Sequence, residues 1–155
     1  METEALKNLV VINGTDIWTE FGVFLTEEKA GGRENLTAIM TPSKAKGHVG
    51  VNIREHDGVK YSAKLDPRND EREVTLHFAL FAETKGEWLR RYRDFIGFLK
   101  RGKEGWLSVC LPELDLTMRM FYVSCSAYKP LTYLWKEGVQ ASRFKVTLKE
   151  PEPTF

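Results

Sequence analysis

The sequence TKGEWLRRYRDFIGFLKRG, at residues 84–102, carries the strongest secondary-structure signal of the chain. Thr84 and Glu87 form a capping box, in which the threonine oxygen accepts from the N–H three residues on and the glutamate reaches back to the cap. Apolar side chains then recur at helical spacing, at Trp88, Leu89, Tyr92, Phe95, Ile96 and Leu99. Gly102 supplies a left-handed C-terminal stop. The pattern predicts one amphipathic helix over about 85–101.

The sequence on both sides of this helix is typical of β-strands, because apolar and polar residues alternate there. Strands are predicted at 74–81, 107–111, 118–123 and 143–149, with shorter candidates at 9–12, 23–25 and 49–54. Turns are predicted at 56–58 and 136–138. Many strands around one helix indicate an α+β, mainly β chain: an antiparallel β-sandwich or barrel-like domain with one flanking α-helix.

The length of 155 residues is that of one ordinary domain, so we expect a single domain over residues 1–155. Residues 26–48 are mostly polar and contain Gly31-Gly32, so they resist assignment to a strand or helix. Two interpretations stay open for them: an extended arm that orders against a neighbouring subunit, or a mobile surface loop. The Pro-containing tail at 150–155 is expected to be loose.

The charge and hydropathy of the chain exclude several classes of partner. Its 23 basic and 22 acidic residues leave a formal net charge of +1, which gives no general attraction to nucleic acid or anionic lipid. No apolar run reaches the roughly 18–20 residues that cross a bilayer. The acidic start, METE, does not resemble a secretory signal. We expect no nucleic-acid specificity, no membrane partner, and a location inside the cell or in a particle assembled there.

Metal and cofactor chemistry find no support in the sequence. His48, His56 and His77 lack the spacing of a ligand set, and no Cys-x-x-Cys occurs. Cys110 and Cys125 each lie in an apolar run, where a thiol behaves as a small hydrophobe. We therefore predict buried free thiols, no metal site and no cofactor.

An enzyme is the least favoured hypothesis. Asp66, Asp70 and Glu71 are the acidic residues that acid–base catalysis would use. They alternate with arginines in a segment that is typical of a solvated turn, whereas catalytic carboxyls need a shifted pKa in a cleft. Neither a Gly-x-Ser-x-Gly elbow nor a phosphate-binding loop occurs. We predict no enzymatic activity, no catalytic residue and no small-molecule substrate.

Seven residues are candidates for an assembly interface. They are Trp18, Phe21, Leu36, Ile39, Met40, Lys44 and His48. The first two are large aromatics, which pack either in a core or at an interface. The next three are the apolar anchors of the polar segment, and the last two belong to a small basic patch.

The order of these features resembles that of bacteriophage distal tail proteins. Residues 11–17 (VINGTDI) and 21–25 (FGVFL) resemble their opening, in which a first strand turns at Asn-Gly-x-Asp before a second strand. Residues 70–78 (DEREVTLHF) resemble their next marker, an arginine ahead of an alternating strand. The capped helix and the strands after it follow in the family's order. The succession spans nearly the whole chain and carries the resemblance.

The resemblance implies a structural phage or prophage tail protein with no catalytic residues to carry over. Its partners would be other copies of the chain and other tail proteins, in a ring of six copies at the junction of tail tube and baseplate. Heterologous contacts that close by rotation would build such a ring. The location would be the virion tail, or a phage-like particle assembled in the host bacterial cytoplasm. The second, C-terminal domain of many distal tail proteins is not expected here.

A ligand-binding β-sandwich module of the carbohydrate-binding type is the alternative hypothesis. Trp18, Trp106 and Trp135 would stack on sugar rings if they shared one open face. The arrangement of these aromatic rings therefore discriminates between a binding module and a structural subunit.

Overall fold

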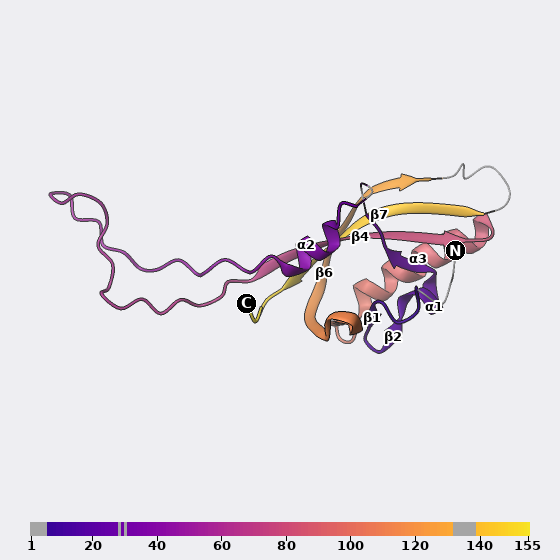
Figure 1. Cartoon of the computed structure of the whole chain (residues 1–155), viewed down its shortest axis with the longest axis horizontal. Coiled ribbons are helices and arrows are strands. Elements are labelled where there is room, and N and C mark those ends of the chain that lie inside the picture. The colour runs from indigo at the N-terminus through magenta and orange to yellow at the C-terminus, as the bar shows by residue number, and fades with distance from the viewer. Residues whose placement is uncertain (1–5, 28, 30, 132–138) are drawn as a thin grey trace.

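The computed structural model describes residues 6–27, 29, 31–131 and 139–155. Among these residues, seven antiparallel strands form one sheet in the order β2-β1-β5-β6-β7-β4-β3 (Figure 1). The strands are β1 (Val11–Ile12), β2 (Thr15–Asp16), β3 (Val23–Leu25), β4 (Arg72–Ala82), β5 (Leu107–Leu111), β6 (Leu116–Pro130) and β7 (Gln140–Glu150). The helices are α1 (Ile17–Phe21), α2 (Glu34–Met40) and α3 (Lys85–Arg101), with a 3-10 turn η2 (Pro112–Leu114).

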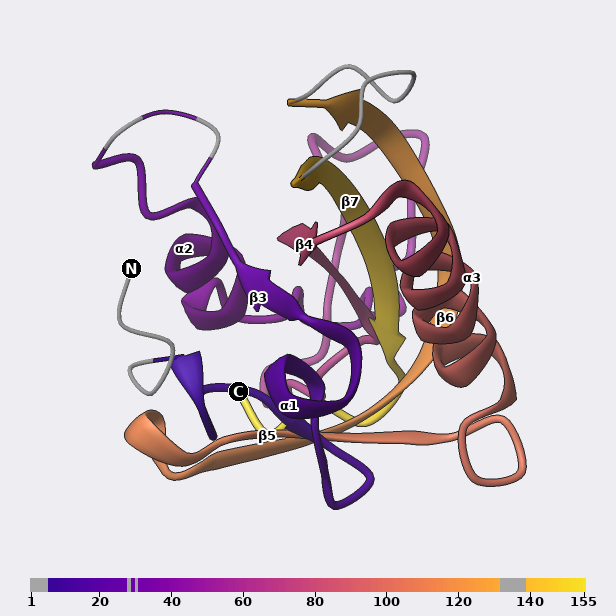
Figure 2. The same ribbon diagram turned by 90° about the vertical axis from the view of Figure 1, so that its right-hand side faces the viewer.

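The sheet curls into a half-barrel because β6 belongs to both of its halves (Figure 2). The first part of β6 pairs with β5, and the part from Phe121 onward pairs with β7. The β6–β7 register shifts between Tyr122 and Ser124 and again between Ser126 and Lys129, where Ala127 has a φ of 54°. Bulges of this kind bend a strand and increase its twist.

Helix α3 spans Lys85–Arg101, the range that the sequence predicts. The Thr84 side chain accepts a hydrogen bond from the Glu87 N–H at 3.2 Å, and Gly102 ends the helix with a φ of 50°. One position departs from the predicted apolar stripe. Leu89 is 48% exposed, because it lies on the side of α3 that faces away from the sheet.

The core lies between the inner face of the curled sheet and α3. Strands β4 and β7 pair along their whole length, from Arg72 opposite Glu150 to Ala82 opposite Gln140. The rings of Phe78, Phe95 and Phe144 meet at its centre, with centroid separations of 5.4 to 6.0 Å. Burial of each such side chain stabilises the fold by about 1.5–3 kcal/mol.

The expected class, mainly β and antiparallel, is confirmed, but the expectation of one helix is incomplete. Helices α1 and α2 contain five and seven residues, too few for an apolar period to show in the sequence. The sheet is one curled half-barrel, so "barrel-like" describes it better than "sandwich".

Candidate assembly interface

A long arm projects from the half-barrel and dominates the outline of the molecule (Figure 1). It consists of residues 42–71, which lie between the end of α2 and the start of β4. No residue of the arm is buried, and only Ser43 and Ile53 are half-buried. The arm is therefore a large surface that the body of its own chain does not cover.

Two extended segments run side by side along the arm and are joined at a turn. Near the root, the Lys46 N–H donates to the Arg68 carbonyl at 2.7 Å. Near the tip, Val51 and Lys60 exchange two backbone hydrogen bonds of 2.8 and 2.9 Å. The His56 N–H donates to the Ile53 carbonyl at 3.0 Å, so the hydrogen-bonded turn spans 53–56 and begins before the predicted turn at 56–58. A two-stranded ribbon of this kind is marginally stable in water by itself.

The two faces of the arm tip, residues 49–61, differ. On one face Gly50 leaves room for Val59 and Tyr61, since a Cβ at Gly50 would lie 2.6 Å from Val59 Cγ1 and 2.9 Å from Tyr61 Cε1. The other face carries Val49 and Val51, which are 91% and 59% exposed. Side chains alternate between the two faces of an extended segment, so these two valines lie together. The second face thus offers apolar surface with nothing packed on it.

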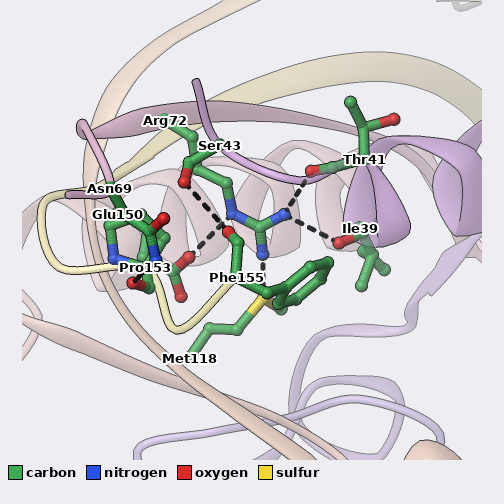
Figure 3. A network of polar contacts seen from close by, with 9 residues as sticks. All are labelled: Ile39, Thr41, Ser43, Asn69, Arg72, Met118, Glu150, Pro153 and Phe155. Atoms are coloured by element: carbon green, nitrogen blue, oxygen red, sulfur yellow. Dashed lines mark hydrogen bonds and ion pairs between the residues drawn. The ribbon is translucent and has the colours of Figure 1, made fainter. Parts of the chain in front are cut away.

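The arm is fixed at its root by the buried side chain of Arg72 (Figure 3). Its Nε donates to Glu150 Oε1 at 2.7 Å, and these two side chains are only 6% and 8% exposed. Its Nη1 donates to the carbonyls of Ile39 and Thr41 at 2.8 and 2.7 Å, which satisfies the end of α2. Nη2 lies 3.4 Å from the sulfur of Met118. One guanidinium thus connects β4, β7, β6 and the point where the arm leaves α2.

The C-terminal tail braces the same root. The Phe155 carbonyl accepts from both the backbone N–H and the hydroxyl of Ser43, at 3.0 and 2.9 Å. Asn69 Nδ2 donates to the Pro153 carbonyl at 3.1 Å, and the Phe155 ring lies 5.0 Å from the Arg72 guanidinium carbon (Figure 3). The tail at 150–155, which the sequence predicts to be loose, is hydrogen-bonded to both segments of the arm.

The observed arm overlaps the predicted segment at 26–48 only in part. Helix α2 occupies the middle of that segment, and its Asn35 is bonded to the end of β3 and to β4. Asn35 Nδ2 donates to the carbonyls of Thr26 and His77 at 2.8 and 3.1 Å, and its Oδ1 accepts from the His77 N–H at 2.6 Å. The first part of the predicted arm is therefore tied to the edge of the sheet.

The seven candidate interface residues lie in different environments. Ile39 is buried, and Phe21 packs on Phe95 and Phe98, so these two candidates are core side chains. Trp18 is half-buried in α1, with its ring edge-on to Phe24. The remaining candidates are exposed on α2 or on the arm. They are Leu36, Met40, Lys44 and His48.

The tryptophans of the carbohydrate-binding alternative do not form an open platform among the described residues. The Arg119 guanidinium carbon lies 3.6 Å from the Trp106 ring centroid, and Phe121 packs edge-on to the same ring. Trp18 lies on α1 and packs edge-on to Phe24. Trp135 and the predicted turn at 136–138 lie outside the described residues.

The acidic residues of the enzyme hypothesis are exposed along the arm. Asp66 forms an ion pair with Arg68 at 2.9 Å, with both side chains at least 70% exposed. Glu71 is half exposed and lies 3.4 Å from Lys149 Nζ. In the part of the chain that the structure describes, no three His, Cys, Asp or Glu side chains are grouped as a metal site.

The clearest pKa shifts belong to an aromatic cluster between α3 and β6. Burial raises the pKa of Tyr92, and its hydroxyl contact with the Cys125 sulfur at 3.6 Å raises it further. Burial also raises the pKa of the Cys125 thiol. Both cysteines are free and half-buried, so the expected thiols are present and less enclosed than predicted. A raised thiol pKa disfavours the reactive thiolate, so this cluster is a packing element.

The described helices include none that is both long and apolar enough to span a bilayer. The body and the arm together define a mainly β class: a curled half-barrel with one long packed helix and a projecting ribbon. A solved structure with a similar fold is the Dit protein (gp 19.1) of SPP1, described as a paradigm of the hub adsorption apparatus in phages that infect Gram-positive bacteria. The two structures align with a TM-score of 0.63 at 11% sequence identity.

That alignment covers 94% of this chain and 50% of the SPP1 protein, so the chain spans about half the length of that protein. No protein-family model matches the sequence. No curated protein matches it either. At this sequence identity the likeness shows a shared fold, and it agrees with the fold that the order of sequence features implies.

Proposed function

We propose that the chain is a structural subunit of a phage or phage-like tail and assembles with copies of itself into a ring. Six copies at the junction of tail tube and baseplate is the arrangement that the family resemblance implies. The fold shared with the SPP1 Dit protein supports a tail role. Tyr92 and Cys125, whose pKa values are raised, belong to a packed aromatic cluster. This cluster therefore supports no competing enzymatic role.

The arm is the observation that carries this proposal. It exposes Val49, Val51 and Tyr61 to solvent, although ordering thirty or so residues costs roughly 1–2 kcal/mol each in backbone entropy. Its own body covers none of that apolar surface. The buried Arg72–Glu150 pair fixes its root and thereby directs it outward. An apolar surface that projects outward and is left uncovered is suited to packing against another subunit.

Sedimentation velocity and negative-stain images of the whole chain test the proposal. A matched variant replaces residues 47–67 by a short glycine turn, because Lys46 and Arg68 are already hydrogen-bonded across the ribbon. We expect the wild type to form particles of one size with ring outlines, and the shortened variant to be a folded monomer with an unchanged far-UV spectrum. A wild type that stays monomeric at every concentration, or a shortened variant that forms the same rings, contradicts the proposal.

A further inference from the structure

Among the described residues, a groove on the body is another exposed apolar surface. It opens between α2 and η2 and encloses about 370 Å³. That volume falls in the lower part of the roughly 300–1,000 Å³ range of protein ligand pockets. Its apolar walls are formed by Leu9, Leu25, Leu36, Ile39, Leu111 and Leu114. We call it the α2 groove.

The half-barrel leaves this groove because its sheet does not close. The sheet ends at β2 on one side and β3 on the other, and the groove separates α2, beside β3, from the turn that follows β5. Asn35 holds the α2 wall in place through its hydrogen bonds to Thr26 and His77. Leu36 of α2 and Leu114 of η2 both line the groove and are 42% and 46% exposed. The site is therefore preformed, and an apolar occupant would cover both leucines.

The open face of the arm tip has the chemistry that this groove would accept. Val49 and Val51 supply β-branched side chains, and Lys60 lies directly across the ribbon from Val51, on the same face. The groove lining includes two carboxylates, those of Glu27 and Glu113, against a single guanidinium. A lysine beside two valines thus matches an apolar groove whose rim is net negative.

We propose that the α2 groove binds the arm tip of a second copy of this chain, with Val49 and Val51 in the groove and Lys60 against Glu113. This inference rests on the proposed function and names the surface that the arm recognises. The arm projects away from its own body, so its tip does not reach its own groove (Figure 1). Each copy therefore offers one arm and one groove, and this heterologous contact either closes into a ring or continues as a filament.

Photo-crosslinking tests the contact directly. A benzoylphenylalanine in place of Val51, in the otherwise complete chain, reports what the open face touches, and the crosslinked peptides are identified by mass spectrometry. Intermolecular crosslinks to 33–39 or 111–114 support the proposal. Crosslinks to any other surface, or the absence of an intermolecular product in concentrated protein, overturn it. Rings whose crosslinks lie elsewhere would leave the proposed function standing and remove only this inference.

Matched substitutions measure the strength of the contact. Leu114→Glu places a charge in the groove, and Leu89→Glu is its control, since Leu89 is equally exposed on α3. We expect Leu114→Glu to weaken self-association at least about 30-fold, the effect of losing one interface hot spot, and Leu89→Glu to leave it unchanged. Equal effects of the two substitutions contradict the proposal.

A charge swap tests the orientation of the arm tip. Lys60→Glu and Glu113→Lys should each weaken self-association, and the double variant should restore it, because the pair is re-formed with reversed sign. A double variant that associates no better than the weaker single variant would contradict the placement of Lys60 against Glu113.

A mixture of two variants tests the groove as the partner of the arm. Shortened-arm chains mixed with Leu114→Glu chains should form only 1:1 pairs, since one intact arm and one intact groove remain. If the two variants do not pair in this mixture, the α2 groove does not bind the arm.

Discussion

The β4–β7 ladder and the arm are both antiparallel and both alternate apolar with polar residues, yet they differ in what lies against them. In the ladder, the inward side chains of Leu76, Phe78 and Val146 are completely buried under α3 and the opposite half of the sheet. In the arm, Val49 and Val51 alternate in the same way and remain mostly exposed. An alternating pattern thus specifies an extended ribbon, and a third packed element decides whether that ribbon is part of the core.

The largest difference in the free energy of unfolding is expected between an alanine substitution in the core and one in the arm. Phe95→Ala removes a ring that is completely buried among three other phenylalanines, and should lower the free energy of unfolding by about 3–5 kcal/mol. Val51→Ala, in the arm, should change the free energy of unfolding of the monomer by less than about 0.5 kcal/mol. Urea unfolding in dilute protein measures both. A comparable loss for Val51→Ala would mean that the arm is part of the core.

The next contrast lies between two ion pairs near the arm. Arg72→Met leaves Glu150 buried without its partner and should cost about 3–5 kcal/mol of stability. Arg68→Met, the control, breaks a pair on the exposed arm and should cost no more than about 1 kcal/mol. The same unfolding measurement compares them. Equal losses would contradict a structural role for the root network.

A smaller effect is expected at the edge of the sheet, where α2 joins it. Asn35→Ala leaves the backbone groups of Thr26 and His77 without their side-chain partner and should cost about 1–3 kcal/mol. It should also weaken self-association, because the wall of the α2 groove loses its anchor. Asn52→Ala, on the exposed arm, is the control for the amide itself and should be close to neutral. A neutral Asn35→Ala would show that α2 is held by other contacts.

The smallest expected effect is a pH dependence of stability that arises from groups in the body. The folded state raises the pKa of Cys125 and Tyr92, so their neutral forms stabilise it. This stability is fully present well below about pH 8.5, the pH at which half of the unfolded thiol is ionised, and is lost as the pH rises through and beyond that value. Unfolding experiments between pH 7 and the alkaline range should show the decline, and Tyr92→Phe should make it shallower. An identical decline in both proteins would assign it to other groups.

Much of the body could be predicted from the sequence because its signals are local. The capping box at Thr84 and the stop at Gly102 bound α3, and strict alternation located β5 and the centres of β4, β6 and β7. The bend in β6 was not predictable, because it depends on pairing one strand with two partners far apart in sequence. Helix α2 was hidden by its polar surroundings, since contacts made by Asn35 with distant backbone hold it in place.

The candidate site was predictable only in part, for the same reason. The polar composition of residues 26–48 predicted an arm there, whereas the alternation of apolar residues at 49–54 predicted a strand. No local signal shows that this strand has nothing to pack on. Arg72 and Glu150 do carry a signal, since each falls in the inward register of its strand, where a charge requires a partner. Their pairing, and the carbonyls that Arg72 binds, come from the tertiary structure.

Hydrogen–deuterium exchange at two protein concentrations tests most directly whether a second copy orders the arm. The amides of Val51 and Lys60 report on the arm tip, and those of β4 and β7 report on the body. We predict fast exchange at the arm tip in dilute protein, strong protection of the tip in concentrated protein, and no change in the body. Tip amides that are equally protected at both concentrations, in a chain that sediments as a monomer, would contradict this prediction.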